Sequence, residues 1–221
     1  PLTEPPSCAC DDGYEASGDG RCTPSATVEQ MQLPDVLHWA YNIQDVDTAR
    51  QREELVGTHF DLYVLEVSTT ERGNADFDMQ GLIRDIRDHN IATRNVNPIV
   101  LAYVDVGQAE EWRWYYDDDW RVGSPGWIVA DDPNGWDGNF VVAYWSDAWQ
   151  DITIYGDARG RSQVEETLTL GFDGIYMDWV EAFSDDHIIG RIADDEGLDD
   201  TASQAEAAER MLDFIENIRY Y

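Results

Sequence analysis

Short apolar runs alternate with longer amphipathic stretches from residue 36 onward, and this alternation restricts the possible folds more than any other feature. The runs are rich in β-branched and aromatic residues, which at this length indicates buried strands. They predict strands at residues 36–43, 61–67, 98–106, 140–145 and 174–177. The stretches between and after them predict helices at residues 48–57, 77–90, 149–170 (broken near 156–160) and 201–220. In the last helix we expect one apolar face, formed by Ala205, Ala208, Met211, Leu212, Ile215 and Ile218.

Strands that alternate with helices indicate βαβ units around a parallel sheet. A doubly wound sheet and a (β/α)8 barrel both fit buried parallel strands. No G-x-G-x-x-G or Walker-type loop follows a strand, which disfavours nucleotide binding. Polar and aromatic residues follow at least four of the strands, and in a barrel these positions share one face. We therefore predict an α/β fold of the (β/α)8 TIM-barrel type.

The number of units is low for such a barrel. Five βα units occupy about 190 residues, whereas a complete barrel takes roughly 250. We expect the C-terminal units to be missing from this sequence or to lie in another chain.

The charge of the chain excludes one class of partner. Fourteen Lys and Arg residues face 46 Asp and Glu residues, for a net charge of −32, and every basic residue is Arg. Such a chain repels phosphate backbones, so nucleic-acid binding is not expected. The acidity fits a surface adapted to high salt, or attraction of a cationic ligand such as an amino-sugar polymer or Ca²⁺. We also expect no membrane span, because no apolar stretch approaches the necessary length.

All three cysteines lie in the first 22 residues, at Cys8, Cys10 and Cys22. Cys8-Ala-Cys10 followed by Gly13-Tyr14 and Cys22 resembles the C-terminal half of an EGF-like module. That resemblance implies a Cys10–Cys22 disulfide and leaves Cys8 to pair with a cysteine outside this segment. We expect residues 1–30 to be an EGF-like remnant and linker, residues 31–221 to be the barrel domain, and the chain to begin inside a longer extracellular or cell-surface protein. Three cysteines without a nearby His make a poor zinc site.

Aromatic rings, carboxylates and amides gather at the predicted strand ends. Rings stack on pyranose faces while acids and amides bind hydroxyls or amines, so the set is typical of a sugar-binding surface. Paired carboxylates across such a cleft also serve glycoside hydrolysis. The candidates are Trp39, Tyr41 and Gln44 after the first strand, Tyr103, Asp105 and Glu110 at the third, Tyr144 and Trp145 at the fourth, and Tyr176, Asp178 and Glu181 at the fifth.

Each candidate also has a structural interpretation. Trp and Tyr near strand ends often cap the core. Asp105 lies inside an apolar run, so it is either at the strand mouth or paired, and Glu110 fits the first turn of a helix.

We assign no metal and no cofactor from the sequence. His38, His59, His89 and His187 are scattered without ligand spacing. The acidic loop at residues 131–139 fails the EF-hand pattern, because Trp136 occupies a ligand position and no Glu closes the loop. The acidic stretch at residues 185–200 is predicted to be a solvated loop.

Several segments resemble one enzyme family, glycoside hydrolase family 114, the endo-α-1,4-polygalactosaminidase-like group of (β/α)8 barrels. The resemblance runs from about residue 34 onward. It rests on WAYNIQ at 39–44, VLAYVDVGQAEEWRWYY at 100–116, PGW at 125–127, GNF at 138–140, YW at 144–145 and GFDGIYMDWVE at 171–181. It implies an extracellular hydrolase of galactosamine-containing polysaccharide that uses no metal or organic cofactor.

The resemblance also implies roles for single residues. Asp178 matches a catalytic aspartate at the end of strand five, and Tyr103, Glu110, Tyr176 and the rim aromatics match substrate contacts. Gln108 stands where many relatives have Glu. The family's second catalytic carboxylate is expected on a later strand, after residue 221. A non-catalytic carbohydrate-binding or surface-structural module on the same barrel is therefore the alternative to a glycosidase.

Overall fold

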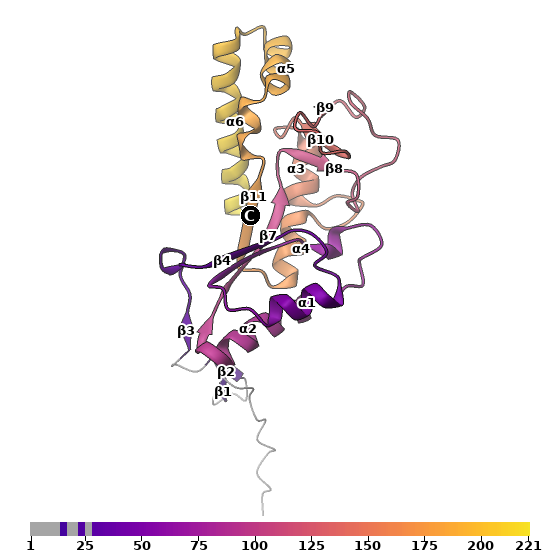
Figure 1. Cartoon of the computed structure of the whole chain (residues 1–221). Helices are drawn as coiled ribbons and strands as arrows, with labels where there is room; N and C mark the ends of the chain where they lie inside the picture. The colour runs from indigo at the N-terminus through magenta and orange to yellow at the C-terminus, as the bar shows by residue number, and fades with distance from the viewer. Residues whose placement is uncertain (1–13, 17–21, 25–27) are drawn as a thin grey trace, which may run out of the picture. The chain divides into compact units, whose positions relative to one another are not determined.

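The structure is a computed structural model that describes residues 14–16, 22–24 and 28–221 (Figure 1). Within it the chain divides into two compact units. The first combines the described part of residues 1–65 with residues 78–101, and the second combines residues 66–77 with residues 102–221. The disulfide predicted for Cys10 and the pairing predicted for Cys8 lie outside the described residues.

The first unit contains parallel strand pairs and two helices. β4 pairs in parallel with β5, with Trp39 opposite Leu62, and α1 connects the two strands. β3 pairs in parallel with β6, while β1 and β2 pair antiparallel. Its elements are β1 (Tyr14–Ala16), β2 (Cys22–Pro24), β3 (Glu29–Gln30), η1 (Leu33–Asp35), β4 (Trp39–Asn42), α1 (Ala49–Val56), β5 (Leu62–Leu65), α2 (Met79–Arg94), β6 (Val96–Asn97) and the start of β7 (Ile99–Asp105).

Local sequence signals fix both ends of α2. The Asp78 side chain caps the helix by accepting a 2.9 Å hydrogen bond from the Gly81 N–H. A Cβ at Gly81 would meet the Asp78 carboxylate, so a larger residue there would require that side chain to shift. The helix ends where Asn95 adopts the left-handed conformation, with φ 59°.

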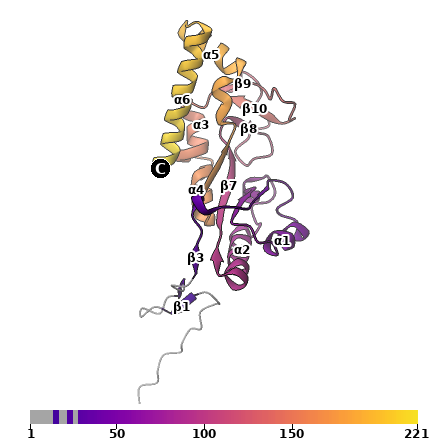
Figure 2. The same cartoon turned by 60° about the vertical axis from the view of Figure 1, so that its left-hand side comes forward.

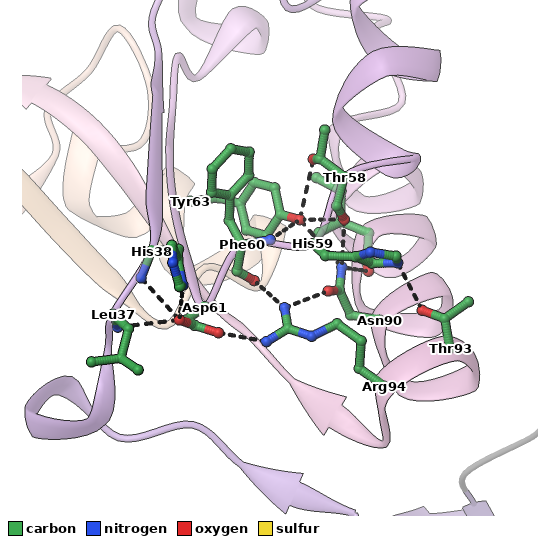
Figure 3. Close-up of polar contacts among 11 residues, drawn as sticks. Leu37, His38, Thr58, His59, Phe60, Asp61, Tyr63, Asn90, Thr93 and Arg94 are labelled. Atoms are coloured by element: carbon green, nitrogen blue, oxygen red, sulfur yellow. Dashed lines mark hydrogen bonds and ion pairs between the residues drawn. The ribbon is translucent and has the colours of Figure 1, made fainter.

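A buried carboxylate ties the start of β4 to β5 and α2 (Figure 3). Asp61 Oδ2 accepts hydrogen bonds from the Leu37 and His38 N–H groups at 3.1 and 2.9 Å. Its Oδ1 pairs with Arg94 Nη2 at 2.5 Å. Beside it, the amide of Asn90 bonds to the Tyr63 hydroxyl at 3.2 Å. These polar groups thus have hydrogen-bond partners within the protein, as buried groups require.

The second unit contains an antiparallel sheet, the rest of β7, β11 and a set of helices. Its elements are η2 (Ser68–Thr70), β8 (Gln108–Glu110), β9 (Ile128–Asp131), β10 (Asn139–Val142), α3 (Asp147–Gln150), the π-helix η3 (Asp151–Tyr155), α4 (Gln163–Leu170), β11 (Gly174–Asp178), η4 (Val180–Ser184), α5 (Asp186–Glu196) and α6 (Asp200–Tyr220).

The fourth predicted strand is present, but its role differs from the prediction. β10 pairs antiparallel with both β8 and β9 instead of joining a parallel array. Apolar β-branched residues signal a buried strand but carry no information on the direction of its neighbours. The strand was therefore predicted correctly at residues 140–142, whereas residues 143–145 lie beyond its end and the expected parallel pairing is wrong.

The C-terminal helices correct two further expectations. Residues 185–200 are not a solvated loop: Asp185 caps α5, whose Ile188 and Ile192 are buried. In α6 the buried residues are Ser203, Ala207, Met211 and Phe214, whereas Leu212 is 63% exposed and Ala205 is also exposed. α5 and α6 lie side by side in both views (Figures 1 and 2), so α5 covers part of α6. The packed face thus differs from the one that apolar spacing alone selects.

The fold is mixed α/β with parallel strand pairs. Closure of the strands into a barrel stays a prediction. None of the helices in the described part of the chain combines the length and the apolar character that crossing a bilayer requires.

Candidate active site

The end of β7 and the end of β11 bring a phenol and a carboxylate together. Tyr103 and Asp105 lie two residues apart on β7, so both point to the same side of the strand. Asp178 is the last residue of β11, and the Tyr103 hydroxyl donates a 2.7 Å hydrogen bond to its Oδ2. The Val106 N–H donates to the Asp178 carbonyl at 3.1 Å, which holds the two strand ends in register.

Glycine is required where β7 ends. A Cβ at Gly107 would lie 2.5 Å from the Trp179 carbonyl oxygen and 2.9 Å from the Trp179 Cβ. Trp179 itself has the left-handed φ of 59°, an uncommon value for a bulky residue. The absence of a side chain at Gly107 allows the backbone after Asp178 to approach this closely.

Asp105 is buried and held by backbone groups. Its Oδ1 accepts hydrogen bonds from the Gly107 and Gln108 N–H groups at 3.1 and 2.8 Å. Burial raises the pKa of Asp105 well above its usual range, and the charges of Glu110 and Asp178 raise it further. The two N–H groups oppose this shift without cancelling it. Asp105 therefore keeps its proton at pH values where an exposed aspartate is ionised.

Glu110 and Glu66 share one buried guanidinium. Arg113 Nε donates to Glu110 Oε2 at 2.6 Å, and its two terminal nitrogens reach the Glu66 oxygens at 2.5 and 3.2 Å. Arg113 Nη1 also donates to the Thr70 hydroxyl at 2.8 Å. Burial raises the pKa of Glu110 despite the nearby cation. Although burial disfavours its charged form, the two carboxylates raise the pKa of Arg113, so it remains a cation.

The cluster has more acids than bases. It contains one arginine, Arg113, and the four carboxyl groups of Glu66, Asp105, Glu110 and Asp178. Burial and these carboxylates raise the pKa of Tyr103, so its hydroxyl stays protonated and donates to Asp178. Asp178 is half-buried while Asp105 and Glu110 are buried. Asp178 is thus the member of the cluster that presents an oriented carboxylate to solvent, as a nucleophile or a base needs.

Two predicted contacts pack against α6. Tyr144 has no exposed surface, and its hydroxyl donates to the Ala207 carbonyl at 2.7 Å. The Arg210 guanidinium lies 4.9 Å from the centroid of the Trp145 ring. Tyr144 therefore serves the packing of this unit, as the core-cap interpretation expected.

Five of the predicted contacts are exposed, unlike the buried Tyr103, Asp105 and Glu110. Tyr176 lies two residues before Asp178 on β11 and is 36% exposed. Glu181 is exposed in η4. The first unit carries the remaining three, all exposed: Trp39, Tyr41 and Gln44.

Sequence reasoning missed the guanidinium of this cluster. Neither Glu66 nor Arg113 was assigned a role from the sequence, although Arg113 follows Glu110 by three positions. The available signal was electrostatic: buried acids at strand ends need a cation, and Arg is the residue that pairs with two carboxylates at once.

The acidic loop at residues 131–139 is organised by hydrogen bonds. Asp132 Oδ2 accepts from the Asn134 and Trp136 N–H groups, both at 2.8 Å. Among residues that the structure describes, no group of three or more His, Cys, Asp or Glu side chains is arranged to hold a metal ion.

Comparison with known proteins identifies a family and several relatives. A model of glycoside-hydrolase family GH114 matches residues 22–217. An uncharacterized protein of Thermotoga maritima is 27% identical over 184 residues, which are 83% of this chain and 48% of the relative. One of Methanocaldococcus jannaschii is 27% identical over 145 residues, 66% of this chain and 36% of the relative. One of Deinococcus radiodurans is 42% identical over 84 residues, 38% of this chain and 25% of the relative. The chain spans less than half the length of each of these curated relatives.

Proposed function

Because the chain belongs to glycoside-hydrolase family GH114, we propose that it hydrolyses a galactosamine-containing polysaccharide by carboxylate chemistry, outside the cell or at its surface. The family match supports a carbohydrate substrate. The extracellular location is supported by the placement of all three cysteines in the first 22 residues.

The proposal rests on the Asp178 carboxylate, which is half-buried and oriented by the Tyr103 hydroxyl at 2.7 Å. We assign Asp178 the role of nucleophile or base. A donor on one oxygen fixes the carboxylate and leaves the other oxygen for the anomeric carbon or for a water. Tyr176, on the same face of β11, is placed to contact the sugar.

Asp105 and Glu110 support Asp178 and are not assigned as the general acid. Both are buried, and Glu110 is occupied by Arg113 at 2.6 Å. Asp105 is held by two backbone N–H groups, so we assign these two residues a positioning role in the ends of the strands around Asp178. The distance from Asp178 to the second carboxylate would set the stereochemistry: about 5 Å for retention and roughly 6.5–9.5 Å for inversion.

A non-catalytic carbohydrate-binding module is the second candidate. The observation in its favour is that the cluster exposes one carboxylate, Asp178, whereas glycoside hydrolysis ordinarily uses two. In this case the site would bind the polymer without cleaving it.

Incubation with partially deacetylated galactosaminogalactan separates the two candidates. We expect the wild-type protein to release oligosaccharides, and Asp178→Asn to reduce the rate by about 10³-fold or more. Asp213→Asn removes the same charge at an exposed position of α6 and should leave the rate unchanged. Equal release by the wild type and Asp178→Asn would remove Asp178 from its role, and binding without release would establish the binding module.

A further inference from the structure

Trp136 presents a large apolar ring to solvent. Its indole is 66% exposed, at the tip of the loop between β9 and β10. Burial of an aromatic side chain stabilises a protein by roughly 1.5–3 kcal/mol, so an exposed Trp gives up a favourable contribution to folding. Exposed Trp side chains are also the ones most enriched at the centres of binding surfaces.

The loop that carries this ring is held from within. The Trp136 N–H donates to Asp132 Oδ2 at 2.8 Å, and the Trp136 carbonyl accepts from the Asn139 N–H at 3.2 Å. The other oxygen of Asp132 accepts a 2.7 Å hydrogen bond from the Gln108 amide, whose oxygen accepts from Asn139 Nδ2 at 2.9 Å. A ring on such a loop loses little conformational freedom when it binds a ligand.

Glycine and acidic residues complete the surroundings of the ring. Gly135 and Gly138 have φ values of +84° and +87°, which make the turn around Trp136 possible. A Cβ at Gly138 would lie 2.7 Å from Glu111 Cγ, so the Glu111 side chain lies against the loop. Asp137 is exposed beside the indole in sequence. The loop that carries the ring therefore also carries or contacts acidic side chains, which accept hydrogen bonds from hydroxyls or from an ammonium.

The same loop is tied to the carboxylate cluster. Asp105 accepts from the Gln108 N–H at 2.8 Å, and the Gln108 side chain donates to Asp132, which in turn holds the Trp136 backbone. Three hydrogen bonds thus connect Asp105, through Gln108 and Asp132, with the backbone of Trp136. A polysaccharide with one sugar unit at Asp178 extends beyond the cluster, so its other units need contacts on the neighbouring surface.

We propose that Trp136 is the stacking platform of an accessory saccharide subsite, which binds one pyranose of a polysaccharide whose other units occupy the Asp178 cluster. This inference rests on the proposed function. A pyranose has an apolar face that matches a flat indole, and its hydroxyls or amine match the flanking acids. Because the loop is hydrogen-bonded to the cluster that contains Asp178, we take a polysaccharide bound at Asp178 as the occupant of the ring.

The test is binding to insoluble, partially deacetylated galactosaminogalactan, measured by the fraction of protein that sediments with the polymer. We expect Trp136→Ala to weaken the affinity by about tenfold and Trp136→Phe, which keeps a smaller ring, to have an intermediate effect. Tyr220→Ala removes another exposed aromatic ring, 76% exposed on α6, and should bind as the wild type does. Melting temperatures within a few degrees of the wild type will show that each variant is folded.

The outcomes distinguish this inference from the proposed function. Hydrolysis of the polymer by the wild type together with wild-type affinity of Trp136→Ala would overturn the subsite and leave the enzyme intact. Trp136-dependent binding without hydrolysis would support the subsite and the binding-module alternative. An absence of polymer binding by the wild type would overturn both.

Discussion

The buried acids of the carboxylate cluster are stabilised in two different ways. Arg113 compensates Glu66 and Glu110 through a planar fork, which a lysine cannot reproduce. Asp105 has no cation in its shell of hydrogen bonds and instead accepts two backbone N–H groups. Ionisation of Asp105 would therefore leave a buried charge without a cation, so the stability of the folded protein should depend on pH.

Asp105→Asn tests this link. Because the pKa of Asp105 is raised in the folded state, the folded protein keeps a proton that the unfolded chain loses above about pH 4. The unfolding free energy should then fall as pH rises through this window, by at most about 1.4 kcal/mol per pH unit. Asparagine cannot ionise, and its oxygen can still accept from the same N–H groups. Relative to the wild type, the variant should gain stability between pH 4 and pH 8 in urea titrations.

An exposed carboxyl provides the control for this measurement. Asp213→Asn should differ from the wild type by a nearly constant amount over the same pH range. If the difference between Asp105→Asn and the wild type is equally constant, Asp105 does not carry the proton assigned to it.

At the scale of elements, Asp61 determines how the first strand pair begins. It connects the backbone before β4 with the last turn of α2 through Arg94, and both of its oxygens are used. Burial opposes ionisation of Asp61, but Arg94 and the two N–H groups outweigh it and lower the pKa of the carboxyl.

Asp61→Asn should lower the unfolding free energy by about 3 kcal/mol at pH 7, since it leaves the partly buried Arg94 without its anion. The lowered pKa means that the native contribution of Asp61 is present above about pH 4 and is lost as pH falls through the native pKa. The difference between the variant and the wild type should therefore shrink in acid. Arg50→Ala breaks the exposed Arg50–Glu54 pair, which water and salt screen, and should change the unfolding free energy far less. Equal losses in the two variants would contradict the role of Asp61.

The elements also show which part of the fold a sequence can reveal. Apolar runs located β5, β7 and β11 within a few residues, because burial and β-branching act locally. Pairing direction is not local, so β10 was placed in a parallel array although its neighbours are antiparallel. Asp185 is a typical helix N-cap residue and could have indicated α5, but the many acidic residues of this segment led to the prediction of a loop.

For the site, too, the sequence revealed what depends on local signals and missed what depends on long-range contacts. The parallel-fold rule predicted that Asp105 and Asp178 would come close, because strand ends of such folds share a face. The bond between Arg113 and Glu66 joins residues 47 positions apart, and nothing in either local sequence selects this partner. The exposure of Trp136 is likewise a property of the folded loop and not of its composition.

For the whole molecule, the net charge of −32 dominates the electrostatics. Fourteen arginines cannot neutralise 46 acids, and most arginines in the described part of the chain already form ion pairs. Self-repulsion among the remaining acids destabilises the compact state, and the same field attracts a cationic polymer. Added salt should act on these two effects in opposite directions.

We expect the melting temperature to rise by several degrees between 0.1 and 1 M NaCl, because the screening length falls from about 10 to about 3 Å. For a chain of this size each 1 kcal/mol of added stability corresponds to about 2–4 °C. Over the same range, sedimentation with partially deacetylated galactosaminogalactan should weaken, while binding to the fully acetylated polymer should change little since it has no ammonium groups. NaCl is preferable to sulfate, which also strengthens apolar burial. A melting temperature that stays flat while polymer binding falls would assign the acidity to substrate capture, whereas stabilisation without a change in binding would assign it to tolerance of high salt.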